Sequence, residues 1–281
     1  AGGVAAIAGG VARTAGKEIT YSTEKSSQES YLGKFLQDIQ WKVVGVLFLF
    51  FVLINLLWNS WIVYPLKILV VFFHESSHGL AAILTGGRID HIEVSQMQGG
   101  VCYTAGGNRF WILSAGYLGS LVWGGIILTL ASRTKFDRYI SLVLGSIIIM
   151  IDVAYVRPFF LSFGSVFGIL AGLGLVLAGY KLPQEINEFL LRITGLTSCM
   201  YATLDIKEDV IDRPGVHSDA WMLSQETGVP TLMWGILWIS VAFVASLFFV
   251  LLACKPRMYG NDSLESCPSA LQLPPPMSLP Q

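Results

Sequence analysis

The sequence predicts an all-α protein that crosses a membrane several times, with six or seven transmembrane helices and a small β-hairpin insert. The first observation behind this fold class is composition: of 281 residues, 53% are hydrophobic and 13% charged, and the mean hydropathy is +0.61. A soluble domain carries about 25% charged residues. The second observation is that charges are clustered, which leaves long stretches without any, such as residues 43–58, 139–151 and 234–254. Such stretches are typical of helices that span a bilayer.

The charge balance excludes one class of partner. Lys and Arg number 18 against 19 Asp and Glu, so the net charge is −1. Without a basic stripe to neutralise phosphates, no nucleic-acid partner is expected. The four cysteines form no CxxC pair and leave the redox compartment open. The lipid bilayer is the expected surroundings, while the membrane, the orientation and the oligomeric state are left open.

The first two spans follow from apolar length. Residues 1–40, rich in Ala, Gly, Ser and Thr, are expected to form a disordered tail. A span needs about 20 apolar residues, and the first candidate covers residues 41–58. Pro65 can then open a second helix, because a first-turn residue needs no intrahelical N–H. This helix is expected to end near Leu84, before the glycines of "TGGR".

A small hairpin is expected after the second span, within residues 88–108. Two β-favouring pieces, residues 92–94 and 101–103, flank a Gly99-Gly100 turn. This hairpin is either a structural re-entrant loop or an edge to which an extended substrate adds as a strand. In the second case Gly99, Gly100 and Val101 would bind the substrate.

The remaining spans follow the same apolar pattern. We expect a third at 110–130, a fourth at 139–156, a fifth at 159–180 and a last at 230–254, with a shorter amphipathic helix at 188–204. Residues 41–254 would then form one integral membrane domain. Residues 255–281, rich in Pro and Ser, are expected to be a second disordered tail.

A polar cluster interrupts the second span. In "HESSH", His74 and His78 are four residues apart, so on a helix they share one face and can grip one Zn²⁺ together. Glu75, next to the first histidine, is close enough to a water at the metal to take its proton. His-Glu-x-x-His is a metalloprotease signature for this reason.

The position of this cluster favours a metal site. A charged residue near the centre of a bilayer costs on the order of 3 kcal/mol. A metal in a water-filled pocket would compensate that cost. The alternative is a metal-free polar interface between helices.

The order of these features resembles the site-2 protease superfamily of intramembrane zinc metalloproteases, and more closely its small, peptidase M50B-like membrane branch. The similarity rests on "YPLKILVVFFHESSHGLAAILTGGRIDHIEV", then "GGV", then "SAGYLGS", and extends to "YATLDIKEDV" and "SDAWMLSQETGVPTLMWGILW". The resemblance implies peptide-bond hydrolysis within the membrane, with His74 and His78 as zinc ligands and Glu75 as general base and acid.

The third ligand is where the sequence departs from that superfamily. The resemblance implies an aspartate, but the Asn-x-x-Pro…Asp-Gly motif that usually supplies it is absent. Asp205 is favoured because it ends an apolar run and can therefore lie at the depth of the histidines. Asp219 is the alternative, and it ranks second because the chain would have to fold back to bring it to the same depth. Asp209 is expected on a solvated polar face, and His217 on the surface.

The sequence therefore predicts a zinc-dependent intramembrane endopeptidase that acts on membrane-embedded protein substrates. Two other functions stay open. One is a non-catalytic membrane scaffold or chaperone-like protein that keeps the fold, which the missing third-ligand motif favours and the intact Glu75 disfavours. The other is a zinc hydrolase acting on lipids or small amides.

Overall fold

The computed structural model describes residues 39–213 and 217–257. The two tails predicted to be disordered, 1–40 and 255–281, lie outside the described residues except for 39–40 and 255–257. The described chain is almost entirely helical, with one two-stranded antiparallel sheet. An all-α polytopic membrane protein with a small hairpin is thereby confirmed. The elements, in chain order, are α2 (Trp41–Leu56), α3 (Tyr64–Leu84), β1 (Arg88–Val94), β2 (Gly100–Ala105), α4 (Arg109–Arg133), α5 (Asp137–Tyr155), α6 (Phe163–Lys181), α7 (Gln184–Ile206), η1 (Lys207–Asp212), α8 (Asp219–Thr227) and α9 (Thr231–Ala253).

Five of the described helices are long and apolar enough to cross a membrane: α3, α4, α5, α6 and α9. Helix α2, with 16 residues, is shorter than a span of about 20. Helix α7 has 23 residues but is too polar to meet the same condition. The expected count of six or seven spans therefore becomes five in the described part of the chain, and the protein is a multi-pass membrane protein.

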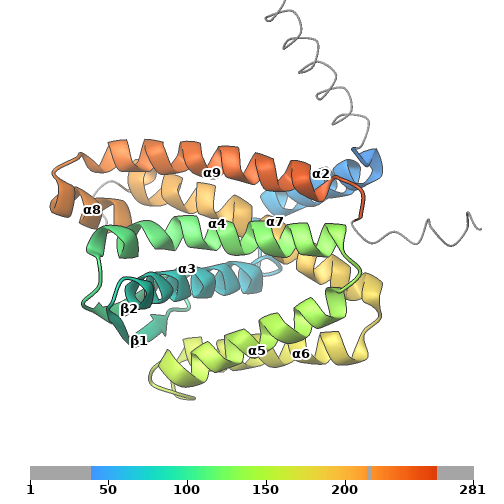
Figure 1. Ribbon diagram of the computed structural model, residues 1–281, viewed down its shortest axis with the longest axis horizontal. Helices are drawn as coiled ribbons and strands as arrows, with labels where there is room; N and C mark the ends of the chain where they lie inside the picture. Colours follow the sequence, from blue (N-terminus) through green and yellow to red (C-terminus); the bar gives the residue numbers. More distant parts are fainter. Residues whose placement is uncertain (1–38, 214–216, 258–281) are drawn as a thin grey trace, which may run out of the picture.

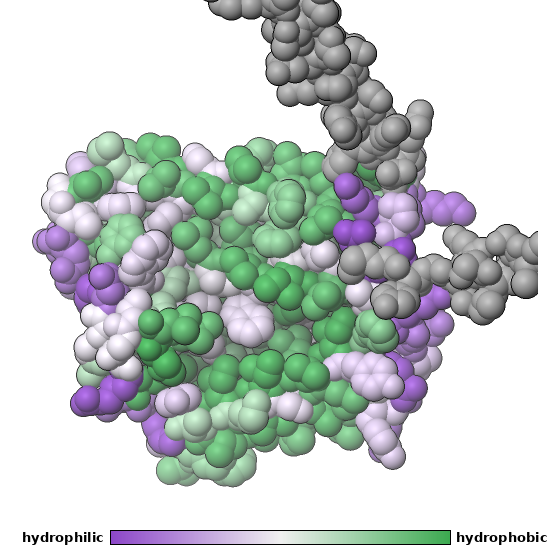
Figure 2. Space-filling view, viewed as in Figure 1, coloured by the Kyte–Doolittle hydropathy of each residue, from purple (hydrophilic) through white to green (hydrophobic). Residues whose placement is uncertain are grey.

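The long helices run roughly side by side (Figure 1). On the face shown in Figure 2, hydrophobic residues cover the middle and hydrophilic residues gather towards the two ends of the bundle. Helix α3 lies inside this bundle, packed on α4 and on both strands. Its apolar residues Ile68, Val70 and Phe72 are at most 1% exposed. A helix whose sides are covered by protein can carry polar groups that lipid would not solvate.

The hairpin lies along α3. Strands β1 and β2 pair from Arg88↔Ala105 to Val94↔Gly100, with an irregularity between Ile89 and His91. Residues 95–99 connect the two strands, so of the expected Gly99-Gly100 turn only Gly99 lies in the connection, and Gly100 begins β2. The carbonyls of Gln96 and Gln98 accept hydrogen bonds from Tyr64 and Tyr201. The hairpin is thus fastened to α3 and α7 at its tip.

Two helices differ from the sequence expectation. Helix α6 begins at Phe163 instead of residue 159. Before it the chain is held against β1, where Val156 forms an isolated bridge with Ile92 and the Arg157 N–H donates to the Ile92 carbonyl. Helix α7 begins at Gln184 instead of residue 188, and the Asn187 side chain in its first turn donates to the carbonyls of Ala178, Leu182 and Pro183. Gly124 and Gly195 bring the α4 and α7 backbones into direct contact. A Cβ on Gly124 would collide with the carbonyl oxygen of Gly195, and a Cβ on Gly195 with that of Gly124.

Candidate metal centre

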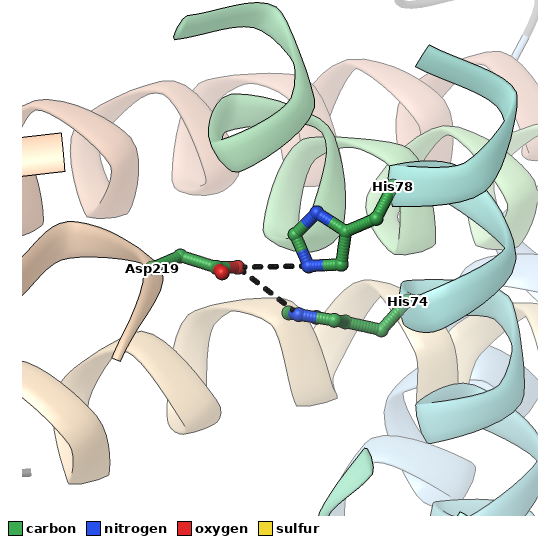
Figure 3. A group of neighbouring side chains, drawn as sticks. All are labelled: His74, His78 and Asp219. Atoms are coloured by element: carbon green, nitrogen blue, oxygen red, sulfur yellow. Dashed lines mark hydrogen bonds and ion pairs between the residues drawn. The ribbon is translucent and has the colours of Figure 1, made fainter. Parts of the chain in front are cut away.

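Helix α3 points two histidines at one carboxylate (Figure 3). The Nε2 atoms of His74 and His78 each lie 3.1 Å from Oδ2 of Asp219. Each of these three residues offers one ligand atom, and those atoms lie within 4.8 Å of one another. Two ligand atoms on a tetrahedral Zn²⁺, with bonds of about 2.0–2.1 Å, lie roughly 3.3 Å apart. The group therefore has the size of a zinc site with three protein ligands.

The third member of this group is Asp219, the alternative named from the sequence, and not the favoured Asp205. After α7 the chain widens into the π-helix η1 and then returns to the site, where α8 begins at Asp219. The side chain of Ser218 caps α8 by accepting from the Trp221 N–H. This fold-back, judged unfavourable from the sequence, delivers the carboxylate of the first residue of α8 to the histidines.

Asp205 lies elsewhere in the same cavity. It is outside the group of three ligand atoms and faces the Tyr201 hydroxyl. Burial, followed by the negative charge of Asp209, raises the pKa of Asp205 to about 7. Asp219 behaves in the opposite way: burial opposes its ionisation, but His78 and His74 outweigh burial and hold its pKa below the ordinary value. Of the two aspartates, Asp219 is therefore the one whose pKa the histidines bring below the ordinary value, whereas burial prevails at Asp205.

A hydrogen bond fixes the orientation of His78. Its Nδ1 lies 2.6 Å from the carbonyl oxygen of Ile112. A carbonyl oxygen only accepts, so Nδ1 carries the hydrogen, and the neutral ring presents the Nε2 lone pair to Asp219. A lone pair and a carboxylate oxygen at 3.1 Å repel unless a proton or a metal cation lies between them. The same carbonyl–histidine contact orients the ligands of many metal sites, so the residues present fit zinc.

Gly116 leaves room for this group. It lies on α4 beside the three ligand atoms, and a Cβ at this position would collide with His74, His78 and Asp219 at once. Gly124, two turns further along α4, packs instead on α7.

Glu75, next to His74 on α3, is held in place by the hairpin. Its side chain is 4% exposed, and the backbone N–H of Cys102 donates to its carboxylate. Gly100 lies directly against the same side chain, where a Cβ would overlap it. The general base proposed from the sequence is therefore placed by β2, which covers it without displacing it.

The site opens into a cavity of about 510 Å³. Residues 97–104, which include the whole inner part of β2, form one wall, and Gly99, Gly100 and Val101 are among them. Among the described residues, β2 pairs only with β1, so its other edge has no partner strand. The cavity thus contains the two histidines, Glu75, Asp219 and an unpaired strand edge.

Sequence reasoning missed a second set of residues in this cavity. The Tyr117 ring is 5.0 Å from that of His74, and its hydroxyl donates to Asp209 at 2.8 Å. Arg213 pairs with the same carboxylate at 2.8 Å. Asp209, expected on a solvated face, instead joins η1 to α4 through Tyr117. The i, i+4 spacing of Asp209 and Arg213 was visible in the sequence, but it does not reveal Tyr117 as a partner. His217 is exposed and stacks on Trp221, as expected for a surface histidine.

The family of the chain follows from comparison with known proteins. A family model described as Peptidase M50B-like matches residues 47–249. The chain belongs to this family. The match covers α3, the hairpin, α4, α8 and nearly all of α9, so every residue described at the site lies inside it. No curated protein and no solved structure matches the chain.

Proposed function

We propose that this M50B-like protein is a zinc-dependent intramembrane endopeptidase. The observation that carries the proposal is the convergence of His74, His78 and Asp219 on one point of a buried cavity, with Glu75 beside them. Membership of a peptidase family and several membrane-spanning helices support it. Site-2 protease-like proteins are typically zinc enzymes, which supports the choice of metal.

Zn²⁺ held by these three residues would supply a Lewis acid that polarises a peptide carbonyl and makes water more acidic. Glu75 would take a proton from the attacking water and return it to the leaving nitrogen, so that the peptide is cleaved to an acid and an amine. The Cys102 N–H would keep the carboxylate aimed at the reacting atoms. Ile112, through its carbonyl, would hold the His78 ring in its ligating tautomer.

The hairpin supports a peptide as the substrate. An extended chain laid beside the free edge of β2 would gain backbone hydrogen bonds along the cavity wall. A membrane-embedded protein segment that unwinds locally is therefore the substrate class we favour. A lipid would make no use of such an edge, and a scaffold would make no use of a carboxylate held beside three metal ligands.

The proposal is tested by separating metal binding from chemistry. Purified wild-type protein, reconstituted with zinc in detergent, is expected to hold about one Zn²⁺ per chain. His74→Ala should lose the metal. Glu75→Gln should keep it and lose cleavage of a membrane-embedded model substrate by roughly 10²–10⁴-fold, the usual range for general acid–base catalysis.

The control is His91→Ala. His91 lies on β1, stacked on Tyr103, and is not one of the metal-ligating group. This variant should keep both zinc and activity. Full activity of Glu75→Gln would refute the mechanism, and a wild-type protein that stays free of zinc would refute the metal.

A further inference from the structure

The catalytic cavity has a side chamber. A second cavity of about 220 Å³ shares part of its wall with the first, namely Met97, Gln98, Tyr201, Asp205 and Arg213. The rest of the chamber is lined by Trp58, Asn59, Lys67 and Glu208. This lining is polar and charged, in contrast to the apolar core around α3.

A buried ammonium faces this chamber. Lys67 is 6% exposed and lies two helical turns before His74 on α3. Within the described residues its ammonium group forms neither a hydrogen bond nor an ion pair; Nζ lies 4.3 Å from the centre of the Trp58 ring. A charged group in such a place needs a polar ligand or water. The chamber is therefore built to receive something polar.

The charged side chains that line the chamber indicate the sign of the ligand's charge. Arg213 is already paired with Asp209 at 2.8 Å. Lys67 then faces two carboxylates, those of Asp205 and Glu208, and neither has an ion-pair partner within the described residues. With both carboxylates ionised, the chamber would hold two negative charges against one positive charge, which is one cation short of neutrality.

The state of Asp205 agrees with this count. Its pKa of about 7, raised first by burial and then by Asp209, leaves it incompletely ionised at neutral pH. A cation in the chamber would stabilise the carboxylate form.

We propose that this chamber is a subsite for a basic side chain of the substrate, a lysine or an arginine near the scissile bond. The cationic head would bind between Asp205 and Glu208. The Lys67 ammonium would then be able to donate to a peptide carbonyl of the same segment. This inference rests on the proposed function, since it places the ligand on a peptide held in the catalytic cavity.

The test measures binding to the Glu75→Gln protein, so that it does not depend on turnover. Fluorescently labelled peptides of one apolar sequence carry a single lysine, glutamine or glutamate, moved through successive positions. At one position the lysine peptide is expected to bind about tenfold more tightly than the glutamine peptide, as for one charge-assisted contact. Asp205→Asn together with Glu208→Gln should reduce that ratio to near one. Lys67→Met, which removes the competing cation, should increase it.

Asp212→Asn is the matched control. Asp212 lies on η1 like Glu208, but it is paired with Lys207 and does not line the chamber, so the ratio should not change. Equal affinity, or no affinity, of lysine and glutamine peptides at every position would overturn the subsite. So would a lysine preference that survives loss of both carboxylates.

Cleavage of the glutamine peptide by wild-type protein is measured in parallel. Cleavage without any lysine preference refutes the subsite and leaves the peptidase standing. A lysine preference without cleavage refutes the peptidase and leaves the subsite standing.

Discussion

At the scale of single residues, the site depends on the absence of a side chain at Gly116. Gly116 adjoins all three proposed ligand atoms, and any larger residue would occupy the space of the metal and its ligands. Gly116→Ala is therefore expected to abolish zinc binding while the helices remain folded. Zinc content after reconstitution and the helical circular dichroism signal measure the two effects.

Gly174→Ala is the control for that substitution. Gly174 lies on α6 with nothing within 4 Å of an added Cβ, so the variant should bind zinc like wild type. Zinc binding by Gly116→Ala would show that the three ligand atoms do not share a metal.

A second prediction distinguishes the two aspartates. Asp219→Ala should remove one of three ligands and leave zinc loosely held, whereas Asp205→Ala should retain it. Zinc remaining after dialysis against a mild chelator is the measurement, with thermal melting as the check on folding. The opposite result, an empty Asp205→Ala site and a filled Asp219→Ala site, would restore the assignment favoured by the sequence.

The sequence was sufficient for His74, Glu75 and His78 because their geometry is local. Four residues on a helix place both rings on one face, whatever the rest of the chain does. Asp219 reaches the site only through the π-helix and the reversal that follow α7, and neither has a period or a motif to reveal it. Hydrophobic continuity favoured Asp205, which lies in the cavity but next to the side chamber.

At the scale of elements, β2 positions the base. Gly100 packs on Glu75, and the Cys102 N–H holds its carboxylate. Gly100→Ala should push Glu75 aside and reduce cleavage by at least about tenfold, while leaving zinc in place, because the ligands are on α3 and α8. A cleavage assay and a zinc assay on the same preparation check both parts.

The neighbouring Gly99→Ala provides the comparison. A Cβ at Gly99 meets nothing within 4 Å, so this variant should lose much less activity. Equal losses in both variants would mean that the turn itself, and not the contact with Glu75, is responsible.

Elements with a strong apolar pattern were predictable, and those stabilised by tertiary contacts were not. Helices α3, α4 and α5 begin and end within a few residues of the expected positions. The start of α7 depends on Asn187, whose side chain donates to carbonyls at the end of α6 and in the loop that follows it. The chain before α6 is held by the bridge from Val156 to β1. Neither contact can be found from the local sequence alone.

At the scale of the whole molecule, the composition predicted a lipid bilayer around the protein. The position of α3 in the core explains how a membrane-spanning helix can carry a polar cluster. The apolar surface between two polar ends is what a bilayer requires (Figure 2). Helix α9 faces outward with many exposed apolar residues, whereas α3 is covered on most sides. The polar cluster that is out of place in a lipid-facing span is therefore admissible in α3.

The fold-back that delivers Asp219 also ties distant parts of the chain together. His74 and Asp219 are 145 positions apart, so a shared metal ion would act as a tether that closes a very long loop. A cross-link that closes a long loop removes more conformational entropy from the unfolded chain than one that closes a short loop. Removing zinc should therefore release α8 and η1 first, while the α5–α6 pair stays protected. Limited proteolysis with and without chelator, with cut sites identified by mass spectrometry, should show new cuts within residues 207–227 that disappear when zinc is restored. An unchanged pattern of cuts would mean that the metal does not restrain α8.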